Sequence, residues 1–597
     1  MDQLYFPFRK MAGVLKIFSL AAAVSFCILF TALPASAQTQ STAVSGGENG
    51  TEPAGKPLNM EDSGKNTGKN SKKNLQRIIP LSSPLYEELD RLYLLAGKSR
   101  PSAARPWSAD EADKILTALP EDDLSGTEKA SFSIARSEIL SGAEDTGPGR
   151  AAGRVTKNIN IEGYFKTDSE REEREHGYEE RKPLIYIPFE GWFFQNLYST
   201  LDLSVKEEYA AIAGSDDNYT NIPSKLTDLD WYFPFRAFIS LGGEHWNIQA
   251  GRDKASWGSG VTGNMLLSDY SDFYNLIKFT TYWDRFKFTS VYIGLDPWLT
   301  NDEKEIDSDG ADDNGLAGGY ENFGELYKAF FGHRIEYRVK DNLALALSEA
   351  IMFGNKYINP AELNPVFVLH NLFIPEYSNA IASIEADYTM IRGLNLYMQF
   401  VMDEFQVPGY ETDDSRPGAN GLLTGLTFTK PLEKGYLTFK GEAAKTDPYL
   451  YNRWHPLTRF TNRRRIWSTY LDKYEYINKP MGYREGPDAV ILYGSAGFDR
   501  PGKFSASLDG KFSMKGELNS SLDDPLSYDT GKDASNLEIL SGTVEKELVT
   551  GIHGTIKPVT DITLSTDIYW VHISDMDNIS GKTVNDLEIA FSVGLVF

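Results

Sequence analysis

The amino-acid sequence predicts a mainly β protein, a transmembrane antiparallel β-barrel of about 18 strands with a small N-terminal α-helical bundle. Two observations predict the barrel. From about residue 158 onward, segments of about ten residues alternate apolar side chains with polar or small ones. The connections between these segments alternate strictly between short turns and long loops. Such segregation is typical of membrane barrels, and a β-sandwich has no reason to show it.

The final strand shows the alternation most clearly, because Ile589, Phe591, Val593, Leu595 and Phe597 share one of its faces. Small or polar residues occupy most of the other face, as a wall with lipid outside and a lumen inside requires. The predicted strands are 158–166, 186–195, 197–208, 234–241, 245–252, 274–282, 284–294, 330–338, 343–352, 381–389, 394–404, 421–430, 434–446, 488–498, 503–515, 543–557, 561–573 and 586–597.

The short connections are tight turns such as Lys340-Asp341-Asn342 and Arg392-Gly393. The long ones run from ~12 to ~40 residues, well above ordinary loop lengths. In membrane barrels the short turns face the periplasm and the long loops face outward. An even strand count then places the N-terminal helices and the C-terminus on the same, periplasmic side.

The N-terminus has the pattern of a secretory signal. Basic residues precede an apolar stretch that ends near Leu33, and Ala35-Ser36-Ala37 forms an A-x-A cleavage site. We therefore expect residues 1–37 to be a signal peptide that is removed on export. A retained membrane anchor is the alternative, which the short apolar stretch disfavours. Cys27, the one cysteine of the chain, lies in this segment, so the mature protein would have no disulfide.

Residues 38–80 should form a flexible linker, because most of this segment is Gly, Ser, Asn and Lys with few large apolar residues. Residues 81–142 should form the periplasmic helical domain. The barrel then occupies residues 155–597.

Helix signals recur within the helical domain. Ser83-Pro84 begins the first helix, with proline at the first helical position. Ser108 and Glu111 have the spacing of a capping box before a second helix. A third, weaker helix covers about 127–140. Their apolar faces need a partner, so we expect the helices to pack on each other or on the barrel.

Composition and motifs exclude several functions. A net charge of −24 argues against nucleic acid as a partner. The sequence has no G-x-S-x-G and no H-E-x-x-H motif, and no pair of its seven histidines has the spacing of metal ligands. We therefore expect a protein that is not an enzyme and has no cofactor, with calcium as the possible exception described next.

The predicted loop 295–329 is strongly acidic. Its carboxylates cluster between turn glycines at Asp307, Asp309, Asp312 and Asp313. Oxygen ligands grouped in this way suit a hard cation such as calcium. The alternative is a solvated acidic loop without a bound ion.

The predicted loop 447–487 is rich in arginine and aromatic residues. Guanidinium groups pair with carboxylates and phosphates, and aromatic faces stack on sugars or cations. This loop could therefore bind an acidic polysaccharide or the phosphates of lipopolysaccharide. Alternatively, its arginines pair with the acidic loops and hold the outer mouth closed. The candidate ligand-binding residues are Arg453, Trp454, Arg463, Arg464, Arg465 and Trp467.

A glycine-rich element, GRDKASWGSGVTGNMLLSD at residues 251–269, leaves a predicted strand. Its glycines permit tight bends that could fold the element into the lumen. A structural constriction of the lumen is one interpretation of these residues, and a surface that faces a ligand is the other.

Three features together resemble the capsule assembly Wzi family. They are the segment PLSSPLYEELDRLYLLAG followed by RPWSADEADKIL, the glycine-rich element, and the even strand count. The resemblance implies an outer-membrane lectin with a helical bundle at the periplasmic end of the barrel. It also implies that Arg252, Trp257 and Gly258 match a W-G motif that shapes a loop or faces a ligand. The chain departs from the family in its long linker and in its acidic loop.

We therefore expect an outer-membrane protein that binds and anchors a surface, capsule-like polysaccharide. Its other partners would be outer-membrane lipids and lipopolysaccharide-like glycans. A porin or solute channel, and a surface adhesin, are the alternatives. The chain ends on Phe597, which resembles the signal that outer-membrane barrels present to the barrel-assembly machinery.

Overall fold

The structure is a computed structural model. It describes residues 73–141, 150–168, 171, 174–209, 219–231, 235–271, 273–301, 303–304, 327–354, 378–404, 419–453, 455–469, 471–522 and 538–597. All of these residues belong to one compact unit. The expected signal peptide at 1–37 and most of the expected linker lie outside them. Among the last residues of that linker, Asn74, Gln76, Arg77, Ile78 and Ile79 are buried.

The predicted N-terminal bundle consists of α2 (Leu85–Leu95), α3 (Ala109–Thr117) and α4 (Gly126–Leu140). Ser108 caps α3 as expected, since its Oγ accepts a hydrogen bond from the Glu111 N–H at 3.2 Å. The reciprocal half of the box is absent, because the Glu111 carboxylate instead pairs with Lys287 of the barrel at 2.6 Å. The complete capping box belongs to α4, at Ser125 and Glu128. None of the described helices is long and apolar enough to cross a membrane.

The barrel wall consists of β2 (Ala151–Val155), β3 (Asn158–Lys166), β4 (Ile185–Phe193), β5 (Leu197–Val205), β6 (Ala237–Gly243), β7 (Trp246–Asp253), β9 (Tyr274–Tyr282), β10 (Phe286–Leu295), β11 (Lys328–Lys340), β12 (Leu343–Gly354), β13 (Ser378–Ile391), β14 (Leu394–Glu404), β15 (Ala419–Leu432), β16 (Gly435–Thr446), β19 (Ala489–Arg500), β20 (Phe504–Lys515), β21 (Glu545–Val559), β22 (Ile562–Ser574) and β23 (Thr583–Val596). Because β2 and β3 both pair with β4 and share one position, the closed antiparallel barrel has 18 strands. Each predicted strand overlaps one of them, which confirms the predicted fold.

In the described turns and connections there are five further short helices. They are the 3₁₀ helices η1 (Glu121–Asp123), η2 (Leu226–Asp228), η6 (Pro456–Thr458), η7 (Glu517–Leu522) and η9 (Met576–Asn578).

The last strand closes the barrel as the alternation predicts. Along β23, Asp586, Glu588 and Ser592 are buried, whereas Leu587 and Phe591 are exposed. This strand pairs with β3. The pairing continues at the terminus, where the Phe597 N–H donates to the Lys157 carbonyl at 2.9 Å and the Phe597 carbonyl accepts from the Lys157 N–H at 3.2 Å. No sheet edge is left open at this seam, which is what a membrane barrel needs.

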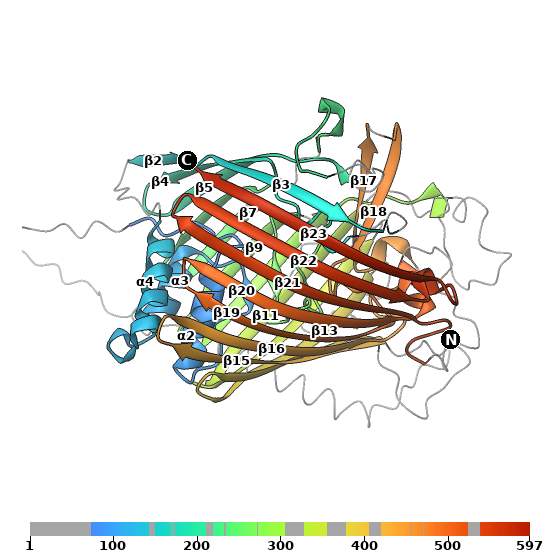
Figure 1. The fold of residues 1–597 in the computed structure, drawn as a ribbon. Coiled ribbons are helices and arrows are strands. Elements are labelled where there is room, and N and C mark those ends of the chain that lie inside the picture. The colour runs from blue at the N-terminus through green and yellow to red at the C-terminus, as the bar shows by residue number, and fades with distance from the viewer. Residues whose placement is uncertain are drawn as a thin grey trace, which may run out of the picture. The chain divides into compact units, whose positions relative to one another are not determined.

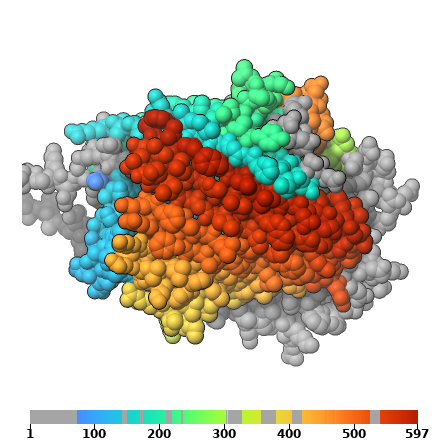
Figure 2. Space-filling view, in the orientation of Figure 1, coloured from blue at the N-terminus to red at the C-terminus, as the bar shows by residue number. Residues whose placement is uncertain are grey.

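All short turns gather at one end of the barrel, with the helices and the C-terminus (Figure 1). We call it the short-turn end, and the opposite one the long-connection end. Figure 2 shows the wall of β19–β23 as a continuous surface that reaches from the helices toward that opposite end. Hydrogen bonds tie the helices to the turns: Thr127 donates to Leu432 at 2.8 Å, and Gly393 donates to Leu94 at 2.9 Å.

Two inserted segments meet inside the barrel. From the short-turn end, residues 98–108 run inward, and their strand β1 (Ala104–Arg105) pairs with β8 (Ser256–Trp257) of the glycine-rich element. The sequence patterns did not predict either strand, because two residues carry no alternation. Together with the wall, these segments bury a large apolar cluster: Ala104, Ala255, Trp257, Met265, Leu266, Leu267, Tyr274, Leu276, Val291, Ile293, Phe330, Ala350, Met352, Ile381, Tyr397, Val401, Leu423, Ala444, Leu450, Tyr451, Phe460, Met481, Tyr483, Ala489, Ile491 and Leu522.

The seam between β3 and β4 is short, with pairs only at Asn158–Tyr186 and Ile159–Ile185. Beyond it, residues 219–222 cover the free edge of β3. The Asn221 side chain accepts from the Glu162 N–H at 2.9 Å and donates to the Asn160 carbonyl at 2.9 Å. This long connection therefore satisfies an edge that would otherwise be unpaired.

The Glu111–Lys287 ion pair generates a stability prediction. Both side chains are 5% exposed, and Lys287 also donates to the Ala104 carbonyl at 2.7 Å. Lys287→Met leaves a buried carboxylate without a counter-ion, which should cost about 3–5 kcal/mol. Thermal unfolding of the detergent-solubilised barrel, followed by its gel mobility shift, measures the loss. Adding Glu111→Leu should restore most of it, and a stable single variant would contradict the pairing.

Candidate functional site at the long-connection end

A β-hairpin rises from the long connection between β16 and β19. Its strands are β17 (Thr461–Ser468) and β18 (Lys473–Pro480), which pair from Thr461–Pro480 to Ser468–Lys473. Figure 1 shows the hairpin at the end of the barrel opposite the helices. The sequence analysis described this segment as a loop, because its arginine and aromatic residues do not alternate with apolar ones.

Three side chains of the hairpin form what we call the aromatic platform: Trp467, Tyr474 and Arg465. The Trp467 and Tyr474 rings lie 4.8 Å apart in an edge-to-face arrangement, and they are 39% and 51% exposed. The Arg465 guanidinium lies 3.6 Å from the Trp298 ring centroid and 4.7 Å from that of Tyr474. Aromatic faces that flank a held guanidinium are suited to stacking on a ring and pairing with its anionic substituents.

The tip of the hairpin is supported by the connection between β5 and β6. Ser468 donates a hydrogen bond to the Glu208 carboxylate at 2.9 Å. Thr469 donates to the Thr227 carbonyl in η2. The platform therefore stands on a braced element.

Arg463 holds the hairpin from inside. Its guanidinium pairs with Glu303, at 3.1 Å for Nη2–Oε1, and donates to the Trp298 carbonyl at 3.2 Å. Glu303 is fully buried and Arg463 is 4% exposed. Glu303 belongs to the predicted acidic loop, so for Arg463 the structure shows the internal pairing that was the alternative to ligand binding.

Arg453 and Arg459 are also internal. Arg459 is fully buried and donates to the carbonyls of Arg453 and Leu522, both at 3.1 Å. Arg453 is 8% exposed. These two arginines hold the base of the connection and do not present their charge at the surface.

Arg464 and Arg252 lie beside a cluster of opposite charges. Arg464 lines a small cleft with Tyr178, Glu179 and Lys479. Lys479 pairs with Glu179 at 2.5 Å, and Lys254 of the glycine-rich element pairs with the same carboxylate at 3.5 Å. Arg252, at the end of β7, has its guanidinium 6.0 Å from the Phe235 ring centroid.

The charges around Glu179 change its acidity. Burial opposes ionisation, but the ammonium groups of Lys479, Lys254 and Lys206 outweigh it and lower the pKa of Glu179 to about 2. The carboxylate is therefore ionised at neutral pH and ties the 174–184 segment to the hairpin and to the glycine-rich element.

Trp257 and Gly258 lie inside the lumen. Trp257 is 1% exposed. Gly258 has a φ of +129°, and a Cβ there would lie 2.1 Å from the Gln399 side chain and 2.3 Å from that of Asn264. Only glycine fits such a position. Of the two interpretations of this element, the structure shows the constriction for these two residues.

Some predicted site residues lie outside the described part of the chain. They are Trp454 and the proposed calcium ligands Asp307, Asp309, Asp312 and Asp313. Among the residues that the structure does describe, no group of three His, Cys, Asp or Glu side chains could hold a metal ion.

The sequence analysis missed constellations that form only across strands. The ring of His553 in β21 is hydrogen-bonded to two carboxylates, through Nδ1 to Asp567 of β22 at 2.8 Å and through Nε2 to Asp509 of β20 at 2.9 Å. Spacing along the chain cannot reveal this group, since its members are 14 and 44 residues apart. Pairing predicted strands in register would have placed His553 opposite Asp567.

Comparison with known proteins shows a likeness of fold. No family model and no curated protein matches this sequence. The solved structure of Wzi, described as an outer membrane protein involved in group 1 capsule assembly in Escherichia coli and as a carbohydrate-binding β-barrel, superimposes with a TM-score of 0.54. The identity is 11%, over 87% of this chain and 99% of Wzi.

Other barrels are less similar. Pseudomonas aeruginosa OprD reaches a TM-score of 0.36 at 10% identity, covering 74% of this chain and 95% of its own. An anion-selective porin from Comamonas acidovorans reaches 0.30 at 10% identity, covering 75% and 100%. The likeness to Wzi confirms the predicted resemblance at the level of the fold.

The Glu179 cluster predicts a pH dependence. A carboxyl whose pKa is lowered on folding stabilises the protein above its unfolded pKa, near 4.5, and loses that contribution as the pH falls toward 2. Glu179→Gln should therefore lower the melting temperature at pH 7, and the difference from wild type should shrink below pH 4.5. The exposed neighbour Glu180→Gln is the control and should match wild type throughout. A deficit that persists unchanged at low pH would contradict the assignment.

Proposed function

We propose that the protein is a bacterial outer-membrane barrel that binds a surface polysaccharide at the aromatic platform and does not catalyse a reaction on it. The observation that carries this proposal is the platform itself: two exposed aromatic rings and a stacked arginine on a braced hairpin. The likeness of the fold to a carbohydrate-binding barrel supports it. A capsule-like polysaccharide that bears carboxylates fits the chemistry, because Arg465 adds a cation to faces that stack on sugar rings.

The outer surface of the wall supports a membrane location. Large apolar side chains are exposed along it, such as Ile239, Leu345, Leu422 and Ile552. Aromatic residues lie near the short turns, such as Trp246. An apolar band with an aromatic girdle fits a bilayer. In this orientation the long-connection end faces outward toward lipopolysaccharide and surface glycans, and the helices face the periplasm.

Export through the signal peptide and insertion through the barrel-assembly machinery, with Phe597 as the insertion signal, complete the proposal. The inserted segments favour a binding protein over an open solute channel. The segments 98–108 and 254–268 pack into one apolar cluster with the described part of the long connection between β16 and β19. This cluster narrows the space that a channel would need for water.

The platform gives a direct test of binding. Trp467→Ala should weaken binding of polygalacturonate by about threefold to tenfold, equivalent to roughly 0.5–1.5 kcal/mol for a lost aromatic contact. Leu471→Ala is the matched control, because Leu471 is equally exposed at the same hairpin but has no ring. Titration calorimetry of the purified barrel measures the affinity, with neutral dextran for comparison. Binding of protein ligands but of neither glycan would favour the adhesin.

Arg465 and Arg463 should separate ligand binding from loop stability. Arg465→Gln should weaken polygalacturonate binding at low salt and flatten its salt dependence, because screening acts on exposed charges. Arg463→Gln should leave the salt dependence of binding unchanged, since Arg463 is buried, but should raise protease sensitivity of the outer connections by leaving Glu303 without its guanidinium partner. If Arg463→Gln alone abolished binding in a protein that resists protease as wild type does, the platform would be misassigned.

A further inference from the structure

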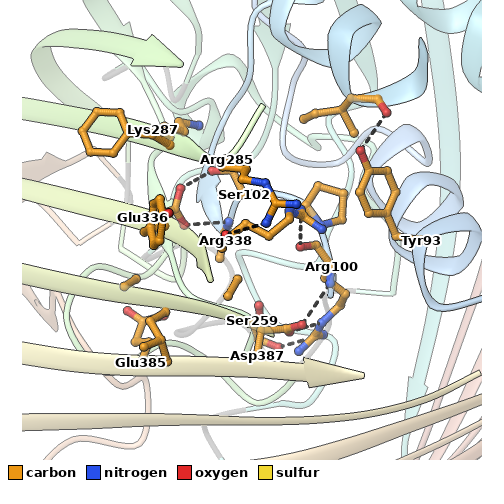
Figure 3. Close-up of a pocket in the computed structure, with 18 of the residues that line it drawn as sticks. Tyr93, Arg100, Ser102, Ser259, Arg285, Lys287, Glu336, Arg338, Glu385 and Asp387 are labelled. Carbon is orange, nitrogen blue, oxygen red and sulfur yellow. Dashed lines mark hydrogen bonds and ion pairs between the residues drawn. The ribbon is translucent and has the colours of Figure 1, made fainter. Parts of the chain in front are cut away.

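A second concave site lies at the short-turn end, away from the aromatic platform. It is a cavity of about 340 Å³ between α3, residues 98–103 and the lumen face of β10–β14. Figure 3 shows its charged side chains, contributed by the inserted segment and by several wall strands. Exposed residues of the short turns, among them Asp284 and Arg285, form its mouth. Its size lies near the lower end of the range for small-molecule sites, about 300–1,000 Å³.

Arg100 provides the cavity with an uncommitted donor. Its side chain is 8% exposed, its Nε donates to Asp387 at 2.8 Å, and its guanidinium lies 4.3 Å from the Tyr397 ring centroid. The Nη1 makes a long contact to the Ser259 carbonyl at 3.5 Å. The buried Nη2 has no hydrogen-bond partner among the described residues. A buried donor without an acceptor destabilises a protein unless something binds it.

Two cations near the mouth, Arg338 and Lys98, lack a carboxylate partner, whereas Arg285 pairs with Asp341 at 2.8 Å. Arg338 donates only to backbone carbonyls, of Ser99 at 3.0 Å and of Arg100 and Asp341 at 3.3 Å. Lys98 donates to the Ala118 carbonyl at 3.2 Å. Neither forms an ion pair with any described carboxylate, although the exposed Asp284 lies on the rim. Across the whole lining, seven cationic side chains face six carboxylates.

Aromatic side chains form part of the remaining walls. Tyr93, Tyr282, Phe286 and Tyr397 line the cavity, and Arg338 lies 5.3 Å from the Tyr93 ring centroid. The cavity has room for about ten water molecules, at ~30 Å³ each. The same space accommodates one sugar ring. Aromatic faces, an excess positive charge and a free guanidinium nitrogen together select a small ring that bears an anion.

We propose that this cavity binds a single anionic monosaccharide unit, with its carboxylate or phosphate on Arg100 Nη2 and its charge balanced by Arg338 and Lys98. The site is independent of the aromatic platform and does not rest on the function proposed for it. Carboxylate and phosphate sugars share this chemistry, so glucuronate and glucose 6-phosphate serve as the two probes.

The test is titration calorimetry of the full-length, detergent-purified protein with each probe. Arg100 itself is a poor target for substitution, because loss of its ion pair with Asp387 would destabilise the inserted segment 98–108. Ala118→Trp instead obstructs the mouth from an exposed position that lines the cavity. Thr117→Trp is its matched control, on the adjacent exposed position outside the lining. Arg338→Gln removes the mouth charge, and Arg136→Gln on α4 is its control.

We expect glucuronate or glucose 6-phosphate to bind one to one, and glucose at least tenfold more weakly. Ala118→Trp and Arg338→Gln should each lower the affinity for the anionic probe at least tenfold. Thr117→Trp and Arg136→Gln should change that affinity less than twofold. The proposal would be overturned if neither probe bound. It would also be overturned if Ala118→Trp and Arg338→Gln left the affinity for the probes unchanged. Inorganic phosphate binding as tightly as the sugars would also overturn it, by showing a plain anion hole. Because none of these measurements involves the platform, failure here is distinguishable from failure of polysaccharide binding there.

Discussion

Inside the barrel, the segment that leaves α2 meets the segment that leaves β7, and Ala104 pairs with Trp257. Backbone groups buried in this way need partners, and the wall supplies them. Lys287 donates to the Ala104 carbonyl at 2.7 Å, and Lys278 donates to the Pro106 carbonyl at 2.8 Å. A barrel of this size is wide enough for water, and these contacts hold the inserted segments inside it.

The aromatic platform depends on the same interior. The Ser268 N–H donates to the Met481 carbonyl at 2.7 Å, at the base of the hairpin. Tyr451 donates to the Met265 carbonyl at 2.6 Å and accepts from the Tyr483 N–H at 2.9 Å. A continuous set of buried contacts therefore runs from the helices through the glycine-rich element to the outer connection. The two candidate binding sites lie at the two ends of this set of contacts, one at each end of the barrel.

The roles of individual arginines show where sequence reasoning stops. Arg463 and Arg465 lie two residues apart on the same strand and belong to the same run in the sequence. Arg463 is buried against Glu303, whereas Arg465 stacks between Trp298 and Tyr474. Composition predicted that the loop carries cations and aromatics for a partner. It could not predict which cations face that partner, because the choice depends on a carboxylate from a connection 160 residues away.

The sequence by itself determined the barrel, its strand count, its two distinct ends and the helices at one of them. Each of those features is specified by residues that are close together in the sequence. The patterns are alternation along a strand, a turn between two strands, and a cap at a helix start. Only the tertiary structure decided that two segments meet inside the barrel, that Trp257 is buried there, and that Arg100 lines a cavity. Those outcomes depend on contacts such as Arg100–Asp387, whose partners are 287 residues apart. No local pattern specifies such contacts, because the closing of the barrel is what brings their partners together.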